Sequence, residues 1–144
     1  MIDIQRRKKE LVNYRGIDIS NWQGSIVFSD VKNSGIEIVY IKATEGNYYT
    51  DPYLQEFYDG ARKNGLLVGF YHFFSPLISA SAQAEYFSEA ISGLTSECRL
   101  VLDLEEAGGY GASELSSIAV EFLEEVKKST GLGVAIYTYA SFAN

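Results

Sequence analysis

The chain has 144 residues, of which 47% are hydrophobic, 14% aromatic and 22% charged, and its formal net charge at pH 7 is −7. This composition predicts one folded domain and excludes disorder, because enough apolar side chains are available to build a core. The negative charge argues against a nucleic-acid binder, which needs a basic surface. The single cysteine, Cys98, excludes an internal disulfide and zinc-finger spacings. A closed eight-stranded barrel typically needs about 250 residues, more than this chain contains.

The first 14 residues are predicted to be an N-terminal extension, and residues 15–144 a single domain. We interpret the basic cluster Arg6, Arg7, Lys8 and Lys9 as part of a solvated terminus. No apolar stretch follows it as in a secretion signal, and no run approaches the ~20 apolar residues of a membrane helix. We therefore expect cytoplasmic synthesis without a signal peptide, and no membrane span.

Strands and helices are predicted to alternate along the chain. β-Branched and aromatic residues mark five strands, at 16–20, 37–44, 67–73, 99–105 and 134–139. Helices are predicted over 25–34, from Asp51 (as N-cap) and Pro52 to Gly65, over 79–93, and from about Leu115 to Gly131. This alternation is typical of repeated βαβ units and a parallel sheet, and leaves open whether the sheet curls.

Carboxylates occur at the carboxyl ends of three predicted strands, where parallel α/β folds bind ligands. They are Asp18, Glu45, and the pair Asp103 and Glu105. Because one residue separates the paired acids, both point to one side of their strand, opposite three leucines. Crowded carboxylates have diverging pKa values, which leaves one group able to act as an acid. The alternative is that all of these acids are ordinary loop or cap charges.

Aromatic side chains lie near these acids. Tyr71 and Tyr137 are candidates for a carbohydrate cleft, because sugar rings have apolar faces and hydroxyl edges; Trp22 is a weaker candidate. We interpret the single histidine, His72, as a hydrogen-bonded core residue rather than a metal ligand. The G-G-Y-G segment at 108–111 indicates a mobile loop and lacks the features of a phosphate loop. No metal or cofactor is expected.

Four motifs follow one another along the chain: G-I-D-I-S-N-W-Q-G, Y-I-K-A-T-E-G-N-Y-Y-T-D, G-F-Y-H-F and V-L-D-L-E. In this order they resemble glycoside hydrolase family 25, the Chalaropsis-type lysozymes, which include many phage endolysins. The resemblance extends from Gly16 to Asn144. The second motif and the final Y-T-Y-A-S-F-A-N look most like the catalytic domains of clostridial phage endolysins.

The resemblance implies hydrolysis of the β-1,4 bond between N-acetylmuramic acid and N-acetylglucosamine in peptidoglycan glycan strands, at the bacterial cell wall after release from the cell. It also assigns roles by position. Glu105 matches the proton donor, Asp103 its positioning or stabilising neighbour, and Asp18 the first-strand acid. Glu45, Tyr71 and Tyr137 match residues that line the cleft. Whether the second step uses water directly or the substrate's acetamido group stays open.

One departure from the family concerns the end of the chain. Family members resemble a parallel (β/α) barrel of the TIM type, in which five β/α units are completed by three further strands with a last inward aspartate. This chain ends after the fifth predicted strand. We therefore expect an incomplete barrel of about five units, with an open edge that invites self-association. The alternatives are an inactive or glycan-binding fragment that needs strands from another chain, and a metal-dependent hydrolase.

Overall fold

The computed structural model describes residues 13–139 and Phe142. The basic cluster at 6–9 and most of the predicted N-terminal extension lie outside the described residues. Residues 140, 141, 143 and 144 of the C-terminal motif lie outside them as well. No helix within the described part of the chain is long and apolar enough to cross a membrane.

Five parallel strands form a curved sheet in the order in which they occur along the chain. They are β1 (Gly16–Ile19), β2 (Ile38–Glu45), β4 (Leu67–Phe73), β5 (Leu100–Asp103) and β6 (Val134–Tyr137). A two-residue strand, β3 (Tyr49–Thr50), pairs antiparallel with the end of β2. Because spatial order follows chain order, the sheet winds in one direction, as in a barrel and unlike a doubly wound sheet. The predicted parallel α/β class is confirmed.

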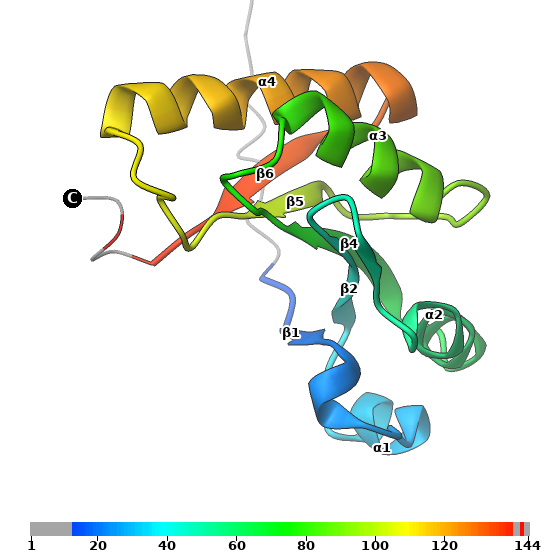
Figure 1. Cartoon of the computed structure of the whole chain (residues 1–144). Coiled ribbons are helices and arrows are strands. Elements are labelled where there is room, and N and C mark those ends of the chain that lie inside the picture. The colour runs from blue at the N-terminus through cyan, green and yellow to red at the C-terminus, as the bar shows by residue number, and fades with distance from the viewer. Residues whose placement is uncertain (1–12, 140–141, 143–144) are drawn as a thin grey trace, which may run out of the picture.

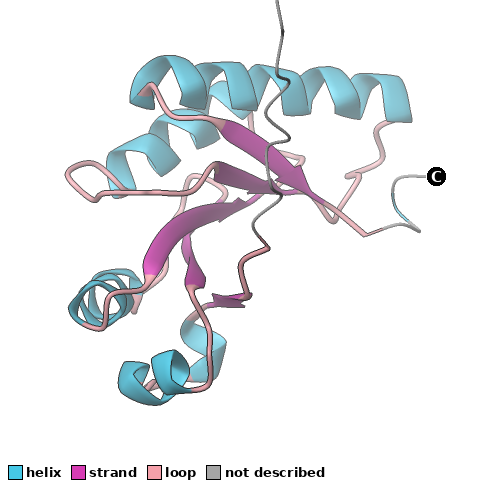
Figure 2. Cartoon of the chain, turned by 180° about the vertical axis from the view of Figure 1, so that it is seen from behind, coloured by secondary structure: helices cyan, strands magenta, loops and turns pink. Residues whose placement is uncertain are grey.

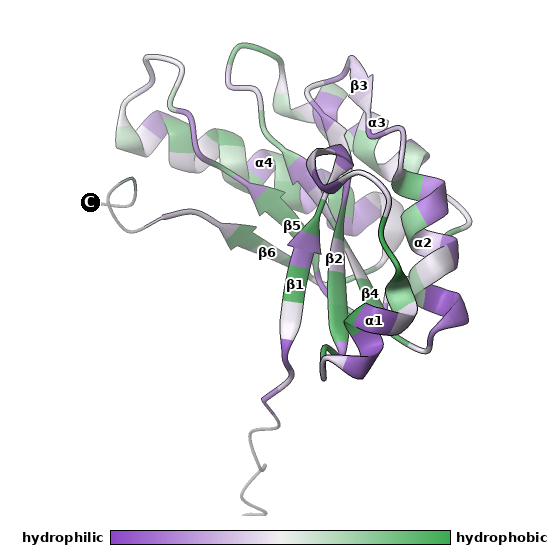
Figure 3. Ribbon diagram, turned by 90° about the horizontal axis from the view of Figure 1, so that it is seen from below, coloured by the Kyte–Doolittle hydropathy of each residue, from purple (hydrophilic) through white to green (hydrophobic). Residues whose placement is uncertain are grey.

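Four helices lie on the convex side of the sheet, as Figures 1 and 2 show. They are α1 (Phe28–Asn33), α2 (Leu54–Lys63), α3 (Ala80–Ala90) and α4 (Ala112–Thr130). In Figure 3 the strands β1 and β6 form the two edges of the curved sheet, with the helices outside. Among the described residues β1 and β6 do not pair with each other, so this part of the chain forms an open, curved sheet, which is consistent with an incomplete barrel.

The start of α2 differs from the prediction. The helix begins at Leu54, and its N-cap residue, Tyr53, makes no side-chain cap hydrogen bond. The predicted cap residue, Asp51, instead accepts hydrogen bonds from two backbone amides, Tyr53 N–H at 2.9 Å and Asn21 N–H at 2.9 Å. Asp51 therefore ties the start of α2 to the segment after β1, and Pro52 precedes the helix instead of occupying its first turn.

The hydrophobic core lies between the sheet and the helices. Its largest fully buried side chains are phenylalanines, each of which stabilises the fold by roughly 1.5–3 kcal/mol through burial. They are Phe57, Phe70, Phe74, Phe87 and Phe122. Within this aromatic cluster His72 stacks on Phe122, with ring centroids 4.9 Å apart.

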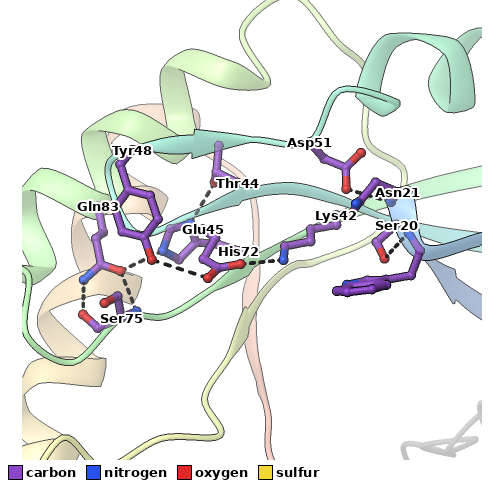
Figure 4. Close-up of polar contacts among 11 residues, drawn as sticks. Ser20, Asn21, Lys42, Thr44, Glu45, Tyr48, Asp51, His72, Ser75 and Gln83 are labelled. Atoms are coloured by element: carbon purple, nitrogen blue, oxygen red, sulfur yellow. Dashed lines mark hydrogen bonds and ion pairs between the residues drawn. The ribbon is translucent and has the colours of Figure 1, made fainter.

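His72 is a satisfied core residue, which confirms the prediction (Figure 4). Its Nδ1 lies 2.7 Å from Thr44 Oγ1, and its Nε2 lies 3.0 Å from Gln83 Oε1. Gln83 Oε1 is an acceptor, so the ring nitrogen Nε2 carries the proton and Thr44 donates to Nδ1. Burial lowers the pKa of His72 to about 4, which keeps the ring neutral near pH 7.

Candidate active site

A pocket of about 460 Å³ lies on the concave side of the sheet, lined by residues from all five parallel strands and from the segment just after β5. It contains five of the six side chains that the sequence predicted for the site: Asp18, Tyr71, Asp103, Glu105 and Tyr137. Its other lining residues are Gly16, Ile17, Tyr40, Val101 and Ile136. The acids lie at the carboxyl ends of their strands, where parallel sheets bind ligands.

Side chains alternate between the two faces of β5, and this alternation directs both acids of the pair toward the pocket. Asp103 and Glu105 both line the pocket. The leucines between and before them point the other way and are buried under the helices: Leu100, Leu102 and Leu104. Asp103 also aligns with Phe73 of β4 and Tyr137 of β6, so it lies in the middle of the sheet edge. The predicted orientation of this strand is therefore confirmed.

Asp103 has the most perturbed carboxyl in the pocket. Its side chain is 9% exposed, and its Oδ1 is buried without a hydrogen-bond partner among the described residues. Burial raises its pKa to about 7, assisted by the neighbouring Glu105 and by the charge of Asp18, while Lys42 opposes the shift. Asp103 therefore keeps its proton at mildly acidic pH, with Glu105 beside it. The sequence predicted that the pKa values of these crowded acids diverge, and in the structure it is Asp103 whose pKa is raised.

Tyr71 of β4 lines the same pocket as Asp18 of β1 and Asp103 of β5. Burial and the negative charges of Asp18 and Asp103 raise the pKa of its hydroxyl. The phenol therefore keeps its proton at any physiological pH and offers a hydrogen-bond donor to the pocket.

Tyr40 and Gly69 shape the interior of the pocket, and sequence reasoning missed both. The two residues are paired on adjacent strands. A Cβ atom at position 69 would lie 2.4 Å from Cε1 of the Tyr40 ring, so only glycine leaves room for this ring. A glycine in the middle of a predicted strand was the available signal.

Lys42 and Glu45 form an ion pair beside the pocket, with 2.7 Å between Nζ and Oε2 (Figure 4). Residues three apart on a regular strand point to opposite faces, but a bulge between Lys42 and Thr44 brings these two together. Glu45 also accepts a hydrogen bond from the Tyr48 hydroxyl at 3.3 Å. Glu45 was predicted to line the cleft; it lies at the same sheet edge as Asp103 but is not among the residues that line this pocket.

Sequence reasoning also missed Lys42. Its side chain is largely buried, and its Nζ lies 5.3 Å from the centroid of the Tyr49 ring and 5.2 Å from that of Phe73. A buried ammonium is costly unless it is paired, and Glu45 supplies the partner. Within residues 13–139 and Phe142, no three His, Cys, Asp or Glu side chains converge as a metal site would require.

Several carboxyl groups in an open, tyrosine-lined pocket at the carboxyl ends of parallel strands are typical of glycoside hydrolases built on (β/α) barrels. Comparison with known proteins agrees with this class. The family model described as Glycosyl hydrolases family 25 matches residues 17–144. The chain belongs to this family.

Individual proteins similar to this chain include lysozymes. The chain is 44% identical over 128 residues to the autolytic lysozyme of Clostridium acetobutylicum, covering 89% of this chain and 39% of that protein. It is 40% identical over 140 residues to lysozyme M1 of Streptomyces globisporus, covering 90% and 48%. The crystal structure of a lysozyme from Streptomyces coelicolor matches with a TM-score of 0.79 at 34% identity, covering 92% and 66%. The chain thus spans less than half the length of these two curated relatives.

Proposed function

We propose that the protein is a muramidase, which hydrolyses the β-1,4 bond between N-acetylmuramic acid and N-acetylglucosamine in peptidoglycan. The observation that carries the proposal is the convergence of Asp18, Asp103 and Glu105 with two tyrosines in one pocket. Family membership and the lysozymes among the relatives support this substrate. The protein's site of action is then the bacterial cell wall, and its binding partner is the glycan strand.

In this proposal Glu105 donates the proton to the leaving glycosidic oxygen, and Asp103 stabilises the positive charge that develops on the sugar. The proton that Asp103 holds accounts for how both roles arise in one pair. Asp103 Oδ1 is a buried acceptor without a partner among the described residues, so the N–H of a substrate acetamido group can donate to it. This bond stabilises the ionised form of Asp103, which gives its proton to the neighbouring Glu105 for transfer to the glycosidic oxygen.

Asp18 and the tyrosines have supporting roles in the same proposal. Asp18 is exposed at the end of β1 and adds negative charge that favours a cationic transition state. The Tyr71 hydroxyl stays protonated and donates to a sugar hydroxyl or carbonyl oxygen. Tyr137 is 54% exposed at the mouth of the pocket, where its ring can stack on a pyranose face.

The test is the clearance of a peptidoglycan suspension by the protein, with the released fragments identified by borohydride reduction and mass spectrometry. A muramidase creates new reducing ends on N-acetylmuramic acid. Glu105→Gln is expected to lower the rate by about 10²–10⁴, the range that a lost general acid costs. Glu106→Gln is the matched control, because this neighbouring acid is exposed and does not line the pocket.

Three results would count against the proposal. They are an equal rate for Glu105→Gln and the wild-type protein, new reducing ends on N-acetylglucosamine, and an equal loss of activity in Glu106→Gln. The third would indicate a general effect of negative charge near residue 105.

The open sheet supports a second candidate function, which is glycan binding that becomes catalytic when further strands pair with the edges. Both β1 and β6 are edge strands within the described residues. An unpaired parallel edge is a template for pairing with another chain, including a second copy. In this case clearance per molecule would rise with protein concentration together with the mass measured by sedimentation. A monomer with constant specific activity would refute it.

A further inference from the structure

Exposed apolar side chains follow the carboxyl ends of the parallel strands, the end of the sheet at which the acids of the pocket lie. The segments after each of the five parallel strands all carry at least one large apolar residue that is at least 37% exposed. The first such residue after each strand, in chain order, is Trp22, Tyr48, Leu77, Tyr110 and Tyr139. Five apolar side chains held in water at the carboxyl ends of successive strands indicate a binding rim, since isolated exposed residues would be scattered over the surface.

Trp22 differs from the other members of this rim. It is 84% exposed, the highest value among the large exposed apolar residues. The hydroxyls of Tyr48 and Tyr139 donate hydrogen bonds to the Glu45 side chain and to the Glu105 carbonyl oxygen, whereas the indole of Trp22 is left largely in solvent. Indole also has the largest π face of any side chain and stacks well on the C–H face of a sugar.

The backbone beneath Trp22 is held rigidly. Residues Asn21–Gln23 form a 3-10 turn, η1, with a capping box: Ser20 Oγ accepts from the Trp22 amide, and Gln23 Oε1 accepts from the Ser20 amide at 2.7 Å. Asp51, which is 2% exposed, accepts from the Asn21 amide and joins the turn to the start of α2 (Figure 4). A side chain on a fixed backbone loses less conformational entropy when it binds a ligand.

The turn lies within reach of the pocket. Trp22 follows the pocket residue Asp18 by four positions in the chain, so their Cα atoms are at most about 14 Å apart. A glycan strand that runs out of the pocket on the β1 side therefore reaches the indole within a few sugar units.

We propose that Trp22 is a sugar-binding platform outside the catalytic pocket, on which a pyranose ring of the same glycan strand stacks. This inference rests on the proposed function and adds to it a second contact with the substrate. We expect the protein to bind long glycan strands more tightly than short fragments, because only a long strand occupies the pocket and contacts Trp22 at the same time. The other rim residues flank the path of the strand.

Trp22 is the only tryptophan in the chain, so its fluorescence reports directly on the platform. The experiment titrates Glu105→Gln protein, which binds without cleaving, with soluble strand fragments of alternating N-acetylglucosamine and N-acetylmuramic acid. A hexasaccharide is expected to shift the emission to shorter wavelength and to protect the indole from acrylamide quenching. A disaccharide is expected to bind in the pocket and to leave the emission unchanged.

Calorimetry on variants supplies an independent measurement. In the Glu105→Gln background, Trp22→Ala is expected to weaken hexasaccharide binding about five- to tenfold, as loss of one stacking contact implies, and Trp22→Phe to restore most of the affinity. Disaccharide affinity is expected to be equal in all of them. Val120→Ala is the matched control, since this exposed apolar residue lies on α4 outside the sheet. Truncation at Trp22 removes little buried surface, so the variant is expected to fold.

The inference is overturned if the hexasaccharide binds with equal affinity to Trp22→Ala and leaves the emission of the parent protein unchanged. Clearance of peptidoglycan by the wild-type protein would then still support the proposed function. If neither fragment binds and no clearance occurs, both the inference and the proposed function fail.

Discussion

Replacement of Asp103 by asparagine tests the electrostatic description of the pocket without relying on catalysis. Asp103 is 9% exposed and lies next to Glu105, and the pKa of its carboxyl is raised to about 7 from an ordinary value of 3.8. The folded protein therefore holds this proton more tightly than the unfolded chain does. Between pH 4 and pH 7 the contribution of Asp103 to the free energy of unfolding therefore falls as pH rises, because the unfolded chain ionises the group at little cost.

The size of the effect follows from the shift in pKa. Each pKa unit corresponds to about 1.4 kcal/mol, which sets a ceiling of about 4 kcal/mol for Asp103 above pH 7. Because the carboxyl opens onto a solvent-accessible pocket, screening reduces this to about 2 kcal/mol. Asp103→Asn removes the ionisation and keeps the shape of the side chain. We expect it to stabilise the protein by about 2 kcal/mol at pH 8, or about 6 °C in Tm, and to change little at pH 4.

The assay is urea unfolding of both proteins from pH 4 to pH 8, read as the difference between them. The difference cancels the contribution of His72, whose lowered pKa gives the opposite slope between pH 4 and pH 6.5. Glu106→Gln controls for the removal of one charge from a chain of net charge −7. A difference that does not vary with pH, or an Asp103→Asn protein less stable at pH 8, would refute the reasoning. The stabilised variant is expected to lose lytic activity, as substitutions at active sites commonly do.

Three further predictions concern residues around the site. Lys42→Met removes the cation that lowers the pKa of Asp103. The pH above which lysis declines should therefore move upward, and the maximal rate of lysis should fall. A pH profile of lysis identical to that of the wild-type protein would contradict this. His72→Phe keeps the aromatic packing but leaves the buried Thr44 hydroxyl without its partner and removes one of the two hydrogen bonds that Gln83 Oε1 accepts. Calorimetry should therefore show about 2 kcal/mol of destabilisation at pH 7 and a smaller loss on acidification to pH 4. Gly60→Ala would place a Cβ 2.4 Å from Cδ2 of the buried Phe28 ring. Although alanine ordinarily favours a helix, urea titrations should therefore show that this variant is destabilised by about 1–2 kcal/mol. Gly111→Ala is the control and should not be destabilised to this extent, because there is open space around Gly111.

Local patterns were sufficient to predict the repeating architecture. Strand and helix periodicity depends on residues close together in the chain, and all five parallel strands occur where the sequence placed them. The two-residue strand β3 and the turn η1 were missed, because segments so short carry no periodicity. The start of α2 was misplaced because an aspartate before a proline is a common cap, whereas Asp51 bonds to a segment 30 residues away.

The sequence by itself also determined which side of β5 faces the ligand, since alternation on a strand is a local rule and Asp103 and Glu105 obey it. Tertiary structure decided the protonation of Asp103 and the ion pairing of Lys42 with Glu45. The raised pKa of Asp103 comes from burial beneath neighbouring strands, and the pairing of Lys42 with Glu45 comes from a bulge that reverses the alternation on β2. The exposure of Trp22 depends on how a buried carboxylate from another segment holds its turn. Desolvation and contacts between distant segments arise only when the chain is packed, so no local pattern encodes them.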